Sequence, residues 1–336
     1  MKKSRYIVLF STLILLLGTQ VSCSDSYLEE KPMDKFSPEN LLTSKKGFET
    51  VIYSLHNFAR SGLFQSNNED VMNTGTDVAC SGVTDGRFFN DYSLILPEHA
   101  TPKFYWNWAY QKMLKDANLV VTRAENPNVS WTEDEKNAIV AEAKFFRAYT
   151  YNILVNLFGG VPIVDKEELS PRFDYTRASR KEVLEFIQKD LEFAAQYLPI
   201  VTSDASQDGR IFRAAANHLL SEVYISLGQE TGDQSFYDKS IAAATAVIDG
   251  SCGEYALVKS RFGDTSRPGD YYSDLFWTNQ QNRASGNKEG IWVVQFEYLT
   301  PGAEEANNAQ LRLWGPKIED VTYPDGKKIL VCDTVG

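Results

Sequence analysis

The sequence predicts a mainly α-helical protein whose helices pair as in tetratricopeptide repeats, followed by a loop-rich C-terminal part with minor β-structure. Three observations indicate this class. Between residues 37 and 250, apolar side chains recur at steps of three and four, as on a helix with one buried face. Capping motifs and glycines separate these runs. After residue 250 the chain is dense in Gly, Ser, Asp and aromatic residues instead.

The first helices are predicted before residue 125. Residues 37–39 begin a short helical turn, and residues 48–58 present a clear helical face that ends near Gly62. Residues 63–102 lose the helical period and are rich in small polar residues. An irregular stretch of this length inside a compact domain is either functional or a misread element, and in a binding protein we favour a functional role. The helical period returns over residues 104–124.

The clearest helix runs to residue 158 and ends abruptly. Thr132, with Glu135 three residues later, forms a capping box at its start. At the other end Gly159-Gly160 release the backbone, and Pro162 prevents the helix from resuming. Arg147 lies mid-helix among apolar neighbours. Because a buried charge needs a partner, we expect a carboxylate to pair with it, and direct contact with a ligand is the alternative.

The later helices read as stacked pairs. A second capping box, Ser179 with Glu182, heads a helix that ends before Pro199. The next two helices are predicted to end at Gly228 and Gly250, and together they resemble a loose tetratricopeptide unit. The two helices before them form a second candidate pair with a longer connector. Such stacks give a stiff scaffold from which loops present a binding surface.

The C-terminal part offers two strand candidates, over residues 291–298 and 327–331. No terminating signal precedes Gly336, so we expect the fold to continue beyond it. The predicted organisation is a signal peptide over 1–22, an acidic tether over 23–36, a helical domain over 37–250 and the start of a ligand-binding region over 251–336.

Charge and composition exclude several classes of function. The chain has 336 residues, 43% of them hydrophobic, and a formal charge of −11. So acidic a protein lacks the electrostatic footprint of a nucleic-acid binder and has little attraction for anionic lipid. No G-x-S-x-G motif or Gly-rich phosphate loop occurs, and the three histidines have no metal-ligand spacing. We therefore expect no enzyme and no cofactor.

Two weaker possibilities concern metal and disulfide bonds. Asp264, Asp270 and Asp274 share one loop and are either a calcium site or, as we favour, a solvated acidic loop. Besides Cys23 the sequence has three cysteines, which are far apart and suggest no disulfide framework. A bridge between Cys80 and Cys252 stays open, with Cys332 left over.

The N-terminus has the features of an exported lipoprotein. A basic start precedes an apolar run over residues 7–17 that is too short to span a bilayer. The sequence Gln-Val-Ser-Cys then ends at Cys23 and is similar to a bacterial lipobox, in which the cysteine is acylated. An ordinary signal peptide with an incidental cysteine is the alternative. Two or more acyl chains, such as palmitate, would anchor the protein stably.

Aromatic residues are the best candidates for ligand contacts. The six tryptophans and 17 tyrosines include several that neighbour amides and carboxylates. A flat indole packs against the C–H face of a sugar ring, while polar side chains bond its hydroxyls. Trp106-Asn107 follows the irregular segment and Trp314 lies in the C-terminal part. Burial in the core is the competing interpretation for each tryptophan, and we favour it for Trp292.

Residues 142–162, EAKFFRAYTYNILVNLFGGVP, resemble the signature of the SusD/RagB family of outer-membrane nutrient-binding lipoproteins. The resemblance implies a non-enzymatic glycan-binding protein on the cell surface, anchored in the outer membrane through Cys23. It also implies delivery of oligosaccharide to a SusC-like TonB-dependent transporter. By matching segments rather than a strict motif, the resemblance implies these ligand-binding residues: Asp77, Arg87, Trp106, Asn107, Tyr298 and Trp314.

Three alternatives stay open from the sequence. Some members of the family take up peptides instead of glycans. A tetratricopeptide-type adaptor would bind protein only, and a surface glycan hydrolase would release products from an oligosaccharide. The sequence contains no feature that favours the hydrolase.

Overall fold

The computed structural model describes residues 37–64, 76–77, 91, 93, 95–296 and 324. The chain divides into two compact units, Met1–Leu41 and Leu42–Gly336. The described part of the first unit contains α3 (Pro38–Leu41), the predicted helical turn, in which the Ser37 amide donates to the Asn40 side chain at 2.8 Å. The remaining described residues belong to the second unit.

The fold is mainly helical, as predicted. Its α-helices are α4 (Lys45–Ala59), α5 (Ala100–Trp108), α6 (Leu114–Arg123), α7 (Glu133–Phe158), α8 (Arg180–Tyr197), α9 (Arg213–Thr231), α10 (Ser235–Ile248) and α11 (Tyr271–Asp274). Single π-helical turns follow two of them, η1 (Arg60–Phe64) and η5 (Ala109–Met113), and short 3₁₀ turns occur at η6 (Ala205–Gln207) and η7 (Arg283–Ser285). Among these described elements, no helix is both long enough and apolar enough to cross a membrane.

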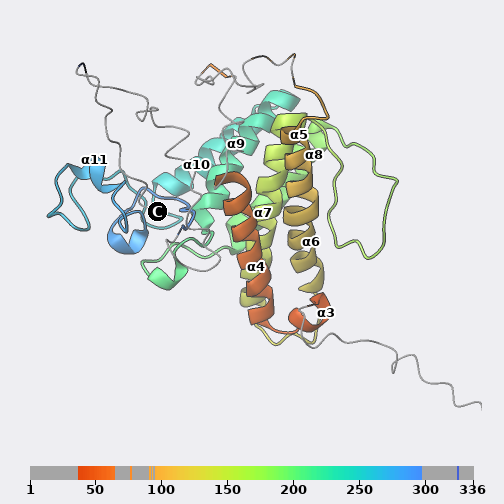
Figure 1. Cartoon of the computed structure of the whole chain (residues 1–336), viewed down its shortest axis with the longest axis horizontal. Helices are drawn as coiled ribbons and strands as arrows, with labels where there is room; N and C mark the ends of the chain where they lie inside the picture. The colour runs from red at the N-terminus through yellow and green to blue at the C-terminus, as the bar shows by residue number, and fades with distance from the viewer. Residues whose placement is uncertain are drawn as a thin grey trace, which may run out of the picture. The chain divides into compact units, whose positions relative to one another are not determined.

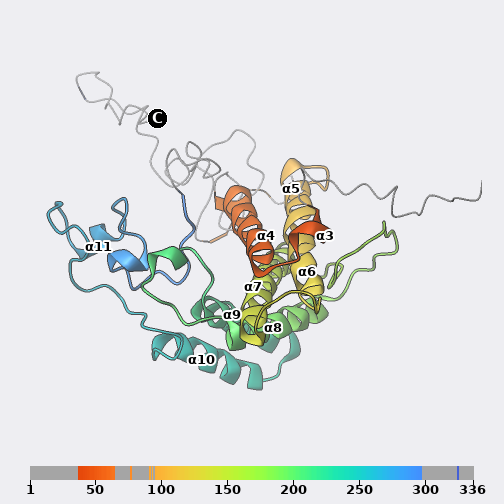
Figure 2. The ribbon, with the colours of Figure 1, turned by 90° about the horizontal axis from the view of Figure 1, so that it is seen from below.

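The helices pack in successive layers around α7 (Figures 1 and 2). Helices α4 and α6 contact one side of α7, α8 packs on α7, and α9 and then α10 continue the stack. The pairs α7–α8 and α9–α10 agree with the predicted tetratricopeptide-like pairing. Because α7 lies between layers, most of its length is buried, including the fully covered Phe146 and Leu154.

Both predicted capping boxes are present. The Thr132 hydroxyl accepts from the Glu135 amide at the start of α7, and Ser179 accepts from the Glu182 amide at the start of α8, with both return bonds formed. At the end of α7, Gly159 has φ 69°, in the left-handed region that favours glycine. A Cβ on Gly160 would lie 2.1 Å from the Ala178 carbonyl oxygen, so the chain passes too closely there for any side chain.

Arg147 is a structural arginine, as expected. Its side chain is 4% exposed, and its Nε and Nη2 donate to the two carboxylate oxygens of Asp190 on α8 at 2.6 and 2.8 Å. Nη1 donates to the Asn118 side chain on α6 and to the Asp165 carbonyl, both at 2.7 Å. One guanidinium therefore joins three helices and the loop after α7.

Two boundaries differ from prediction. Helix α9 does not end at Gly228 but runs to Thr231, and Gly232, with φ 71°, is the C-terminal residue in the left-handed region. Gly228 serves packing instead, since a Cβ there would lie 2.8 Å from the Tyr237 ring on α10. The region predicted as one helix over 104–124 contains the π turn η5 between α5 and α6.

The predicted strand over 291–298 is wrong over the part that can be compared. Residues 291–296 are not a strand, and no strand occurs among the described residues. The apolar run is explained by Trp292, which packs among aromatic side chains. The second strand candidate, 327–331, lies outside the described residues, as does Tyr298.

The three aspartates predicted to share a loop lie before and within α11, and an arginine holds the last of them. Asp274 has no exposed surface and accepts from Arg261 Nε at 2.6 Å. Asp264 bonds Ser266 and Arg267, and Asp270 caps α11. In the described part of the chain, no group of three or more His, Cys, Asp or Glu side chains is placed to hold a metal ion. Cys252 is a free, buried cysteine whose sulfur accepts from Asn217.

Candidate functional site

Trp106 and Asn107 lie side by side on α5. The Trp106 ring is half-buried and stacks on Tyr110 with centroids 5.2 Å apart and planes 11° apart. The Trp106 ring also contacts the ring of Phe158, with centroids 5.4 Å apart and planes inclined at 46°. Asn107 is exposed, and its side chain accepts from Gln111 at 3.3 Å. We call these four side chains, Trp106, Asn107, Tyr110 and Phe158, the Trp106 face.

The end of the signature stretch supports this face. Phe158 is the last residue of α7, and the Tyr110 hydroxyl donates to the carbonyl of Pro162 at 2.6 Å. Burial raises the pKa of Tyr110 far above its usual range. The helix end and the Gly-Gly-Val-Pro turn therefore fix the orientation of the stacked pair.

Three of the six predicted ligand-binding residues are described. Trp106 and Asn107 are consecutive residues of α5, the first half-buried and the second exposed, and Asp77 is exposed in a bend. Arg87, Tyr298 and Trp314 lie outside the described residues, as does the lipid-attachment candidate Cys23. Sequence reasoning missed Tyr110 and Phe158 as supports. The i, i+4 spacing of Trp106 and Tyr110 was the available signal for the first.

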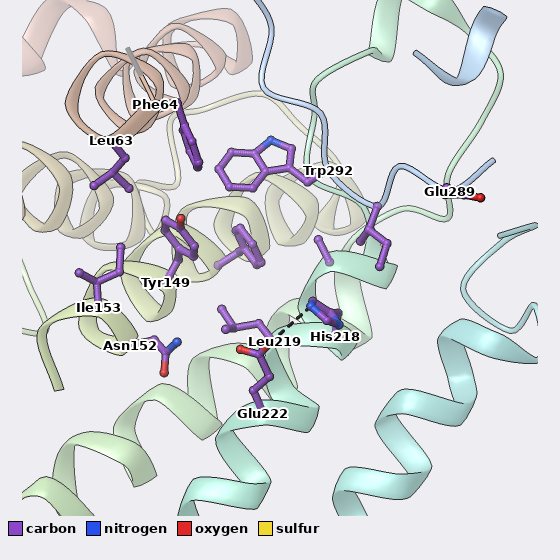
Figure 3. A pocket seen from close by; sticks show the side chains of 13 residues that line it. Leu63, Phe64, Tyr149, Asn152, Ile153, His218, Leu219, Glu222, Glu289 and Trp292 are labelled. Atoms are coloured by element: carbon purple, nitrogen blue, oxygen red, sulfur yellow. Dashed lines mark ion pairs between the residues drawn. The ribbon is translucent and has the colours of Figure 1, made fainter. Parts of the chain in front are cut away.

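A second feature is a cavity of about 790 Å³ (Figure 3). Its walls are mostly apolar and come from η1, α7, α9 and residues 289–292. Its aromatic and charged lining side chains include Phe64, Phe145, Tyr149, His218, Glu222 and Trp292. In Figure 3, Phe64, Tyr149 and Trp292 crowd the upper side of the space, and the ion pair of His218 with Glu222 lies at the lower side, 3.4 Å long.

Trp292 is the centre of the aromatic wall. Its Nε1 donates to the Gly209 carbonyl at 3.2 Å. Five rings meet its indole at angles between 67° and 88°, those of His56, Phe64, Phe145, Phe146 and Tyr149. Such edge-to-face contacts favour a rigid cluster. The interpretation of Trp292 as a packing residue holds, although it also lines the cavity. The cavity suits an apolar group better than the open face of a sugar.

The chain belongs to the SusD-like family. A family model described as "Starch-binding associating with outer membrane" matches residues 26–225, more than half of the sequence. SusD-like protein P2 of Formosa agariphila is 26% identical over 298 residues, which are 85% of this chain and 52% of that protein. The chain spans about half the length of the relatives that it matches, between 39% and 56%.

Solved structures share the fold. One is a laminarin-binding SusD-like protein, with a TM-score of 0.50 and 26% identity, matched over 64% of this chain and 44% of that one. Another, solved with a xylogluco-oligosaccharide, has a TM-score of 0.58 and 19% identity over 82% of this chain and 50% of that one. At 19% identity, the similarity to the second structure concerns the fold alone.

Proposed function

We propose that this protein binds oligosaccharide at the cell surface and delivers it to a SusC-like TonB-dependent transporter without breaking a bond. Membership of a family described as starch-binding and outer-membrane-associated supports the proposal, as does similarity to a laminarin-binding protein. The organisation that we propose is a signal peptide over 1–22, a tether over 23–36 acylated at Cys23, a helical domain over 37–250 and a ligand-binding region beginning at 251.

The single observation that carries the sugar site is the Trp106 face. A ring stacked in parallel on a supporting ring is held flat, and a flat indole beside an exposed amide matches the C–H face and hydroxyl rim of a sugar. We propose that Asp77, Arg87, Tyr298 and Trp314 complete the site around Trp106 and Asn107.

The test is calorimetric titration of the purified protein with oligosaccharides from laminarin, xyloglucan and starch. Trp106→Ala is expected to weaken binding about tenfold, a loss of about 1.4 kcal/mol. Phe173→Ala is a matched control, because Phe173 is 93% exposed on the loop between α7 and α8. Absence of glycan binding by the wild type would overturn the function. Equal binding by wild type and Trp106→Ala would overturn only the site.

A further inference from the structure

A polar groove lies between α4 and the loop that precedes α9, away from the residues of the Trp106 face. Two cavities adjoin there, of about 260 and 630 Å³, and both are lined by Tyr53 and Arg210. Asn57 and Asp208 line the smaller cavity, while Glu49 and Asp134 line the larger one. We call this surface the Tyr53 groove.

Tyr53 presents an aromatic ring to solvent. It is 54% exposed, although the neighbouring Val51, Ile52 and Leu55 on α4 are buried. The guanidinium carbon of Arg210 lies 5.5 Å from the ring centroid, a cation–π contact that steadies the ring. The groove therefore has an accessible flat apolar surface at its centre.

Arg210 is itself held rigidly. Its Nε donates to both carboxylate oxygens of Glu142, at 3.0 and 3.1 Å, and Glu142 is 3% exposed. His56 Nε2 lies 2.7 Å from the same carboxylate, and the Ile211 amide donates to it at 3.3 Å. A clamped arginine keeps its orientation when a ligand arrives, which lowers the entropy cost of binding.

The rim of the groove supplies hydrogen-bond acceptors. The carboxylates of Glu49 and Asp134 have no hydrogen-bond partner among the described residues. Carboxylates accept hydrogen bonds and repel anions, while the polar lining disfavours a purely apolar ligand. Sugar hydroxyls donate to carboxylates and accept from a guanidinium, and sugar C–H faces pack on a phenol ring.

We infer that the Tyr53 groove is a second contact site for a neutral oligosaccharide, separate from the Trp106 face. This inference rests on the proposed glycan-binding function. Aromatic contact at Tyr53 supplies apolar packing, and Glu49, Asp134 and Arg210 bond hydroxyl groups on either side of it. A chain that reaches the groove would be held at two places on the protein.

The experiment titrates Tyr53→Ala and Tyr53→Phe with the neutral oligosaccharides from laminarin, xyloglucan and starch. Tyr53→Ala is expected to weaken binding about fivefold, whereas Tyr53→Phe keeps the ring and most of the affinity. Tyr175→Ala is the control, since Tyr175 is 41% exposed and lies on the loop between α7 and α8, away from α4 in the sequence. Urea unfolding of each variant verifies that the exposed substitution leaves the fold intact.

The outcomes separate the two proposals. If the wild type binds a glycan and Tyr53→Ala binds it equally well, the groove is not a sugar site and the Trp106 proposal stands. If no glycan binds, both proposals fail. An oligogalacturonate, which is anionic, is a further probe. Tyr53-dependent binding of oligogalacturonate in preference to the neutral sugars would overturn the assignment of a neutral ligand.

Discussion

At the scale of single residues, Glu142 couples the stability of the fold to pH. Burial alone would raise the pKa of this carboxyl, but the hydrogen bond from His56 and the positive charge of Arg210 lower it to about 2 from an ordinary value of 4.5. A carboxyl group whose pKa is lower in the folded state than in the unfolded state stabilises the fold at pH values above its unfolded-state pKa. This stabilisation is lost as the pH falls through the pKa of the folded state.

Glu142→Gln is expected to remove this dependence. The free energy of unfolding of the wild type should fall between pH 4.5 and about 2, and the variant should show a shallower fall from a lower starting stability. Urea unfolding at a series of pH values measures both slopes. Glu49→Gln, at a carboxylate without hydrogen-bond partners among the described residues, is the control. Parallel slopes for wild type and Glu142→Gln would contradict the assignment.

Arg147→Met tests the buried ion pair. Among the described residues, it leaves the Asp190 carboxylate, whose side chain is 3% exposed, with Lys144 as its one remaining ion-pair partner, at 3.5 Å. Breaking a buried pair on one side costs about 3–5 kcal/mol, so urea unfolding should show a loss of that size. The double variant Arg147→Met/Asp190→Leu is expected to recover most of it, because the buried carboxylate is removed as well and the ammonium of Lys144, whose side chain is 21% exposed, reaches solvent. A loss below about 1 kcal/mol in the single variant would argue against the pair as a structural anchor.

The sequence predicted the type of role of single residues, but it did not predict which residues they contact. The position of Arg147 on an apolar face predicted a carboxylate partner, but Asp190 lies on another helix, and periodicity says nothing of tertiary pairing. Trp292 was correctly expected to pack, yet its part in lining a cavity depends on rings from α4, η1 and α7. Nothing in the sequence indicated the groove around Tyr53, because the residues that line it are scattered between positions 45 and 295.

At the scale of elements, the capping boxes decide where α7 and α8 begin. Ser179→Ala is expected to lower the free energy of unfolding by about 1 kcal/mol, because it removes the acceptor for the Glu182 amide. Ser179→Asp should retain most of the stability, since aspartate is an equally good N-cap. Thermal or urea unfolding of the three proteins measures this order. Equal stability of Ser179→Ala and wild type would refute it.

Helix boundaries followed the sequence where capping chemistry was local. Both capping boxes and the Gly-Gly stop after α7 were predicted because their partners lie within four residues of one another. Gly228 was misread as a helix end since its role, close approach to Tyr237, involves a different helix. The strand over 291–298 was predicted from an apolar run, which cannot be distinguished by pattern from an extended segment that packs on helices.

At the scale of the whole molecule, the proposed anchor lies outside the described residues. Cys23→Ser is expected to move the protein from the membrane fraction to the soluble fraction, because acyl chains at Cys23 would be its attachment. Fractionation and metabolic labelling with palmitate measure the change, with Cys252→Ser as the control at a free, buried cysteine. Unchanged membrane association and labelling of the Cys23→Ser protein would contradict lipidation there.

The fold class was predictable because stacked helices repeat one local pattern many times. The family followed from a continuous stretch of 21 residues, 142–162, and the family model matches a longer region, residues 26–225, that includes this stretch. A binding surface assembled from separate loops leaves no comparable pattern. Of the six predicted contacts, only Trp106 and Asn107 are consecutive in the sequence, and the other four lie elsewhere in the chain.

The π turn η5 has a consequence for the direction in which Trp106 faces. A π turn holds one more residue than an α turn, and one residue corresponds to about 100° of rotation around a helix axis. Deleting the exposed Gln111 would restore an uninterrupted α-helix. The helix before the deletion, including Trp106 and Asn107, would then rotate about the helix axis relative to α6. Trp106 would then leave Phe158 while α6 kept its place on α7. The one additional residue in the π turn therefore determines the direction in which the Trp106 side chain, the centre of the proposed sugar site, projects from the helix.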